Sequence, residues 1–117
     1  MKKILLGMLL MVSFVYSSEL IHPLDFNGTK AEKEKVVKLI EVYVKEVYSK
    51  IGMGDAMTLR MMEAEELRAF KVLTKVESRK LLDSVMKTYC AIGMCTYTTI
   101  NMMYIEQDKA SKGKLEW

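Results

Sequence analysis

Residue types on which enzymes commonly depend are scarce in this chain of 117 residues. The only histidine, His22, is followed by the only proline, Pro23. Because this one histidine lies in a predicted N-terminal arm, we expect no histidine-based catalytic triad, and it cannot supply a metal site with two histidine ligands. The sequence also has no c-type haem attachment motif. Glycine is also sparse, and Gly52-Met53-Gly54 lacks the lysine and the preceding strand of a phosphate-binding loop. We therefore expect no catalytic residues, no cofactor and no enzyme activity.

Neither sign of charge is in large excess. The 18 Lys and Arg residues against 15 Asp and Glu give a formal net charge of +3, and two of these three excess charges are Lys2 and Lys3. The remaining charges are interspersed, without the basic patch that binds a nucleic acid backbone or the block that binds an anionic membrane surface. The composition thus argues against nucleic acid as a partner.

The first residues have the order of an export signal. Met1-Lys2-Lys3 precedes an apolar run from Ile4 to Tyr16, which is followed by Ser17 and Ser18. A cationic start, an apolar centre and a small-residue exit are typical of a cleavable signal peptide. The apolar run is shorter than the roughly twenty residues that a helix needs to cross a bilayer. We predict a signal peptide over residues 1–17, cut after Ser17. A cut after Ser18 and an uncleaved membrane anchor are the alternatives.

The predicted leader also indicates where the protein works. No cysteine lies near its end to carry a lipid, so we expect no stable membrane anchor after cleavage. A short leader that begins with lysines is typical of bacteria, and we predict a periplasmic protein of a Gram-negative cell.

Beyond the leader, apolar residues recur at helical spacing and no segment alternates at period two. Residues 18–28 are predicted to form an irregular arm, because His22-Pro23 disfavours helix and Asn27-Gly28 is a turn signal. The helical domain is predicted over residues 29–110, and residues 111–117 are predicted to be a frayed tail. Short connections between amphipathic helices predict an all-α fold, a compact bundle of three to four antiparallel helices.

The helix boundaries follow from capping and stop signals. Thr29 and Glu32 have the spacing of a capping box, which predicts a first helix from Thr29 to about Ile51. The glycines at 52, 54 and 93 are expected to end helices. Further helices are predicted over about 55–73, from about 78 to the break at Gly93, and over 96–110. The apolar residues expected on the inner faces of these helices are Val36, Val37, Ile40, Tyr43, Val44, Val47, Tyr48, Ile51, Leu59, Met62, Leu67, Phe70, Leu73, Leu81, Leu82, Val85, Met86, Tyr89, Tyr97, Ile100, Met103 and Tyr104.

Cys90 and Cys95 are the only cysteines. An even number of cysteines in an exported chain favours a disulfide. Residues five apart in an unbroken helix are too distant for that bond, but Gly93 lies between them and can break the helix. We predict a disulfide that closes the corner between two helices. Free buried thiols, or a redox-active or metal-binding pair, are the alternatives.

Methionine is abundant, with eight of the eleven residues beyond position 17. Met53, Met57 and Met61 are spaced four apart, and Met86 and Met94 lie four residues on either side of Cys90. Thioether and thiolate ligands suit Cu(I), so these five methionines could serve a soft metal. Methionine at helical spacing is more often adaptable core filling or the lining of a partner groove, and on this reading the chain has no metal site.

Three carboxylates, Glu63, Glu65 and Glu66, cluster on the second predicted helix. A paired acid and base could be imagined there. We instead expect a solvated face opposite Leu59, Met62 and Phe70.

The sequence leaves two candidate functions for this protein. The first is a non-catalytic protein-binding or structural module of the cell envelope, whose partner is another envelope protein. Methionines, tyrosines and the terminal Trp117 favour it, because Met and aromatic residues are enriched in interfaces. The alternative is a carrier of a small ligand or of Cu(I), with its site between helices.

Overall fold

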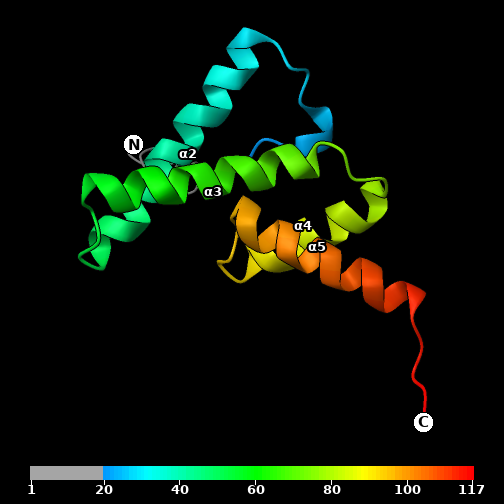
Figure 1. The fold of residues 1–117 in the computed structure, drawn as a ribbon. Helices are drawn as coiled ribbons and strands as arrows, with labels where there is room; N and C mark the ends of the chain where they lie inside the picture. The colour runs from blue at the N-terminus through cyan, green and yellow to red at the C-terminus, as the bar shows by residue number, and fades with distance from the viewer. Residues whose placement is uncertain (1–19) are drawn as a thin grey trace, which may run out of the picture.

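The computed structural model describes residues 20–117, so the predicted leader and its cleavage site lie outside the described residues. A short 3₁₀ turn, η1 (Pro23–Asp25), precedes four α-helices (Figure 1). These are α2 (Lys30–Lys50), α3 (Ala56–Leu73), α4 (Arg79–Ala91) and α5 (Tyr97–Lys112). Residues 20–117 contain no strand, and the predicted all-α class is confirmed.

Each α-helix begins after a residue whose side chain accepts a hydrogen bond from the backbone N–H three residues further on. These N-caps are Thr29, Asp55, Ser78 and Thr96. Such caps satisfy backbone donors that have no partner within the helix. The predicted capping box is half right: Thr29 caps α2, but the Glu32 carboxylate accepts from the N–H of Asn27 rather than of Thr29.

The helices stack in an order that differs from their order in the chain. α3 packs against α2 on one side and against α5 on the other, and α4 packs against α5. In Figure 1, α2 crosses α3 instead of running alongside it, and α4 and α5 form a hairpin on the opposite side. α3 is therefore the central helix, and the two helix pairs meet along it.

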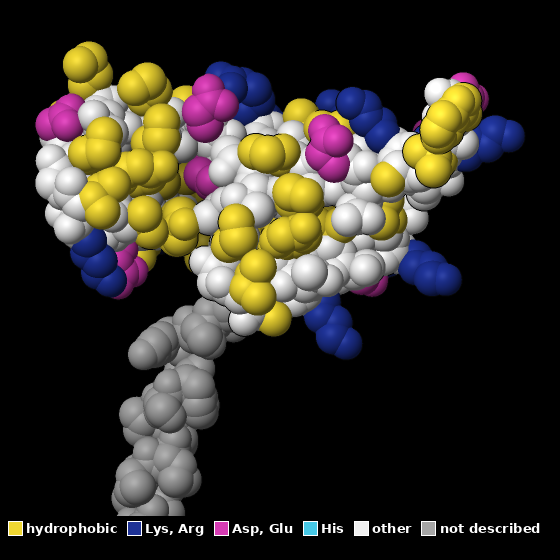
Figure 2. All heavy atoms as spheres, turned by 90° about the horizontal axis from the view of Figure 1, so that it is seen from below, with side chains coloured by type: hydrophobic (Ala, Val, Ile, Leu, Met, Phe, Trp, Pro, Cys, Tyr) yellow, Lys and Arg dark blue, Asp and Glu magenta, His cyan; other side chains and the backbone are white. Residues whose placement is uncertain are grey.

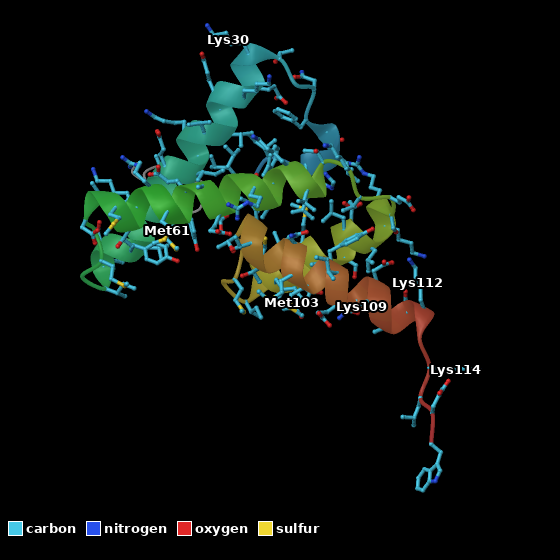
Figure 3. All side chains as sticks on the ribbon, in the orientation of Figure 1. Lys30, Met61, Met103, Lys109, Lys112 and Lys114 are labelled. Atoms are coloured by element: carbon cyan, nitrogen blue, oxygen red, sulfur yellow. A yellow bond between two sulfur atoms is a disulfide. The ribbon has the colours of Figure 1, made fainter. Side chains whose placement is uncertain are left out.

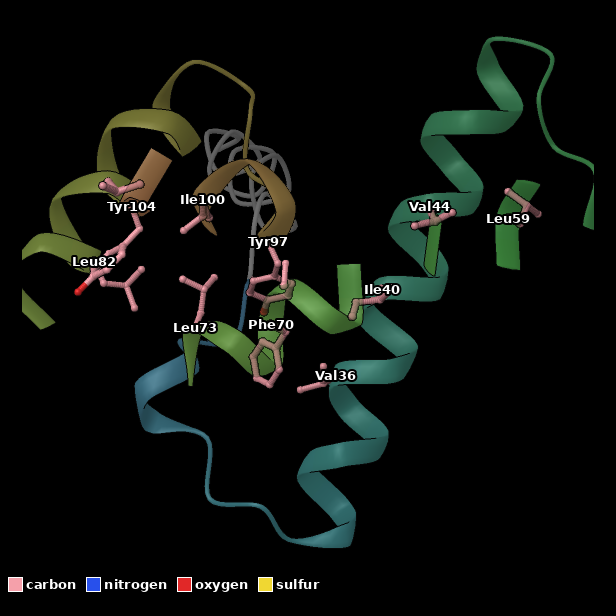
Figure 4. Packing of buried hydrophobic residues seen from close by; sticks show 12 residues of the cluster. Val36, Ile40, Val44, Leu59, Phe70, Leu73, Leu82, Tyr97, Ile100 and Tyr104 are labelled. Atoms are coloured by element: carbon pink, nitrogen blue, oxygen red, sulfur yellow. The ribbon is translucent and has the colours of Figure 1, made fainter. Parts of the chain in front are cut away.

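One continuous hydrophobic core joins the two pairs (Figure 4). Val36, Ile40 and Val44 of α2 are buried against α3, as predicted. The prediction is wrong for Val37 and Ile51, which are 41% and 61% exposed, because the buried stripe of α2 is narrower than its run of apolar residues. Phe70 and Tyr97 lie where the pairs meet, with ring centroids 4.9 Å apart in an edge-to-face arrangement. The rest of the buried hydrophobic core consists of Leu59, Ala69, Leu73, Leu82, Val85, Ile100 and Tyr104.

The N-terminal arm, predicted to be irregular, contains η1 and is held firmly against the helices. Pro23 is buried, and the ring of Phe26 packs edge-to-face on Phe70 with centroids 5.2 Å apart. The hydroxyl of Tyr97 bonds both backbone groups of Ile21, accepting from its N–H at 3.0 Å and donating to its C=O at 2.8 Å. Burial raises the pKa of this phenol, which therefore stays protonated and able to donate.

Two polar contacts join the arm to α4. Nε2 of His22 lies 2.6 Å from a carboxylate oxygen of Asp83, while its Nδ1 accepts from the N–H of Leu24. Asp25 and Arg79 form a bidentate pair with both distances 3.0 Å. Hydrogen bonding to Arg79 lowers the pKa of Asp25. The single histidine and the Asp25–Arg79 pair together hold the arm against α4.

The predicted disulfide between Cys90 and Cys95 is confirmed, with a Cα–Cα distance of 4.1 Å. α4 ends at Ala91, and Gly93 has φ +82°, a left-handed conformation that reverses the chain and brings Cys95 back towards α4. The bond therefore closes the corner between α4 and α5.

Replacing both cysteines by serine should lower the free energy of unfolding by about 2 kcal/mol, because the chain-entropy model gives a ring of this size that contribution. Urea denaturation followed by circular dichroism measures it. Dithiothreitol should destabilise the wild-type protein equally and leave the double variant unchanged. A wild-type protein indifferent to dithiothreitol under unfolding conditions would contradict this stabilising role.

Candidate binding cleft

A cleft of about 210 Å³ lies where the C-terminal half of α2, the middle of α3 and the beginning of α5 meet. α2 contributes Tyr43, Val44 and Tyr48 to its walls. The residues from α3 and from the start of α5 are Met62, Glu65, Glu66, Thr96, Thr98 and Thr99. The cleft therefore combines aromatic, thioether, carboxylate and hydroxyl groups, and no lysine or arginine of residues 20–117 lines it.

Glu66 is the most deeply buried of these polar residues, with an exposed fraction of 7%. Its carboxylate accepts from the backbone N–H of Tyr97 at 2.8 Å and from the hydroxyl of Thr98 at 2.7 Å, with a longer bond of 3.4 Å to the N–H of Thr98. A side chain of α3 thus caps the N-terminus of α5, where the helix dipole favours a negative charge. This contact fixes α5 against α3 and sets the shape of the cleft.

The expectation of a solvated carboxylate face is wrong for Glu66. Glu63 is also largely covered, with 15% of its side chain exposed and a bidentate pair to Arg60 at 2.7 and 2.8 Å. Glu65 is the member that matches the expectation: half of its side chain is exposed, and it pairs with Arg68 at 2.6 Å. Each carboxylate serves a different contact, and the three do not form a paired acid and base.

The negative charge of Glu66 reaches the opposite wall of the cleft. Burial raises the pKa of the Tyr43 phenol, and the charges of Glu66 and Tyr48 raise it further. Tyr43 therefore stays neutral and faces a region of negative potential.

The methionines discussed as possible soft-metal ligands lie on different elements. Met53 is in the turn between α2 and α3, so it does not continue the helical stripe of Met57 and Met61 on α3. Met86 packs against the core from α4, and Met94 is in the turn before α5. The sulfurs of Cys90 and Cys95 are joined, so neither is available as a thiolate. Within residues 20–117, no group of three or more His, Cys, Asp or Glu side chains is placed to hold a metal ion.

Five methionines are unusually exposed, with exposed fractions between 45% and 74%. We call Met53, Met57, Met61, Met94 and Met102 the methionine surface. Three belong to the α2–α3 turn and the start of α3, the helix that supplies Met62, Glu65 and Glu66 to the cleft. Met94 and Met102 belong to the α4–α5 turn and to α5, whose first residues also line it. Seen from below, hydrophobic side chains gather over two lobes separated by a hollow (Figure 2). Met61 lies on the lower side of α3 in Figure 3, whereas the labelled Met103 packs partly against the core and does not belong to this surface.

A second, more open groove of about 240 Å³ lies between α2 and α3. It is lined by Val37, Ile40, Glu41, Ala64 and Leu67 together with the Arg60–Glu63 pair. The groove resembles the cleft in charge, because Glu41 is left outside its Arg60–Glu63 pair just as Glu66 is left outside the Glu65–Arg68 pair. It provides a matched comparison for experiments on the cleft.

Comparison with models of protein families, with curated proteins and with solved structures found no match to this chain. Among the helices of residues 20–117, none combines the length and the apolar character needed to cross a membrane. The cleft and the surface around it are therefore the features from which we propose a function.

Proposed function

We propose that this chain is an exported, periplasmic helical protein that acts as a non-catalytic protein-binding module of the cell envelope. The methionine surface is the observation that carries the proposal. Large apolar side chains exposed together are typical of interaction sites, and methionine suits such sites because its unbranched, polarisable side chain adapts to a partner. The cationic start and apolar run of residues 1–17 support export, and the disulfide suits an oxidising compartment.

The alternative of a Cu(I) carrier would have to bind the metal through thioethers alone, because both thiols are in the disulfide. Four of the five candidate methionines, all but Met86, are exposed to solvent. Exposed thioethers that are spread over helix α3 and two different loops suit an adaptable contact with a protein better than a closed metal site.

The proposal predicts site-specific crosslinking in the periplasm. A photoreactive amino acid at Met61, which is 51% exposed, should crosslink to one discrete envelope protein in intact Gram-negative cells. The same group at Lys30, at the far end of α2 in Figure 3, is the control and should give no such product. Immunoblots of periplasmic and cytoplasmic fractions, with mass spectrometry of the adduct, provide the measurement.

Three results would contradict the proposal. The protein could remain in the cytoplasmic fraction with its leader uncut, which would refute export. Equal labelling from Met61 and Lys30 would show that the surface is not selective. A product containing only a second copy of this chain would replace the envelope partner with self-association.

A further inference from the structure

The cleft holds a carboxylate whose charge no cation neutralises. Glu66 receives its hydrogen bonds from two backbone N–H groups and a threonine hydroxyl, all of them formally neutral donors. Among residues 20–117, no lysine or arginine lies within ion-pair distance of it, and the cation nearest in the chain, Arg68, pairs with Glu65. The N-terminal dipole of α5 offsets about half a charge. The cleft therefore keeps a net negative potential.

Its aromatic wall suits a cation as well. Tyr43 and Tyr48 line the cleft from α2, opposite the carboxylates of α3. The face of a tyrosine ring attracts an ammonium or guanidinium group, and this attraction adds to that of a nearby carboxylate.

The volume of the cleft distinguishes two possible ligands, a free small-molecule cation and a cationic side chain of a larger molecule. Sites for free small molecules usually enclose roughly 300–1,000 Å³. At about 210 Å³, the cleft is smaller than this range and partly open, so it suits one side chain projecting from a larger molecule. The methionine surface, which lies partly on the same helices, would pack against apolar side chains of that same molecule.

Building on the proposed function, we infer that the cleft receives a lysine or arginine side chain from a basic amphipathic segment of the partner protein. The cationic group lies between the carboxylate of Glu66 and the rings of Tyr43 and Tyr48, and it shares the half-exposed carboxylate of Glu65 with Arg68. The apolar face of the segment covers the methionine surface. Charge complementarity selects the partner, and the methionines accommodate its shape.

The test is an NMR titration of the ¹⁵N-labelled protein with a synthetic amphipathic helix that carries leucine on one face and lysine on the other. The same peptide with glutamate, or with glutamine, in place of lysine serves as a comparison. The lysine peptide should bind roughly tenfold or more tightly than the glutamate peptide, because like charges meet in the second complex. The largest shifts should fall on Tyr43, Tyr48, Met62 and Thr98.

Two variants probe the cleft without removing the buried cap of α5. Glu65→Gln should weaken binding of the lysine peptide about two- to fivefold, the range expected for one exposed ion pair. Tyr48→Leu, which keeps an apolar side chain, should weaken it about threefold through the lost cation–π contact. Glu41→Gln, in the second groove, is the matched control and should leave the affinity unchanged.

Several outcomes would overturn the inference: equal or tighter binding of the glutamate peptide, shifts centred on the second groove, or an effect of Glu41→Gln as large as that of Glu65→Gln. If acetyl-lysine methylamide alone bound as tightly as the peptide, the cleft would be a small-molecule site instead. Crosslinking at Met61 without binding of the lysine peptide would reject the cleft assignment but retain the proposed function. Peptide binding without any crosslinked partner would refute the proposed function.

Discussion

Replacing Glu66 by alanine should lower the free energy of unfolding by about 3 kcal/mol. The substitution removes a helix cap, which costs roughly 0.5–2 kcal/mol. It also leaves the buried backbone N–H of Tyr97 without an acceptor, and an unsatisfied buried polar group costs roughly 1–3 kcal/mol. The half-buried hydroxyl of Thr98 can still bond that of Thr96. Urea denaturation followed by circular dichroism would show the loss as a lower transition midpoint with an unchanged slope.

Two further variants separate the cap from other effects of the substitution. Glu66→Gln keeps one carbonyl acceptor and should lose about half as much stability as the alanine variant. Glu65→Ala removes the neighbouring, half-exposed carboxylate and should change stability by less than about 0.5 kcal/mol. Equal effects of the alanine substitutions at 65 and 66 would contradict a specific role of the buried carboxylate.

Replacing Phe70 by alanine should have the largest effect of any single substitution in the core, a loss of about 4 kcal/mol. Its side chain is 2% exposed and contacts Phe26 from the arm and Tyr97 from α5. Truncating a buried phenylalanine typically costs 3–5 kcal/mol through lost transfer energy and the cavity left behind. In a domain of this size that is a large part of the total stability.

Val72→Ala is a suitable control, because Val72 is on the same helix but 46% exposed, and its loss should be within about 0.5 kcal/mol. Phe70→Leu should fall between the two. We also expect the alanine variant to loosen the arm, measured as faster amide hydrogen exchange at Phe26. Protection at Phe26 that matched the wild type would show that the arm does not depend on this ring.

The helices could be predicted from the sequence because their signals are local. Thr29 and Thr96 were placed correctly as helix starts, and Gly93 as the break that permits the disulfide. The packing of the helices could be predicted less well from the sequence, since α2 crosses α3 and makes its main helix contacts with it. Such crossings depend on which faces fit together, and the spacing of apolar residues does not determine that.

The candidate site was largely missed, because its polar residues act on partners far away in the sequence. Glu66 caps a helix that begins 31 residues later, and the ring of His22 meets Asp83 at a separation of 61. One signal could have identified Glu66: it lies in the apolar stripe that continues from Leu59 and Met62 to Leu73. A carboxylate in that register is on the buried side and requires a donor there.

The double hydrogen bond between Tyr97 and Ile21 has a consequence for the timing of maturation. The start of the fold is held by its last helix, across 76 residues of chain. In the export we propose, the polypeptide crosses the membrane with its N-terminal end first, so Ile21 has no docking site until α5 has emerged. A peptidase therefore has the whole period of translocation to reach the junction after Ser17 while that segment is still unfolded.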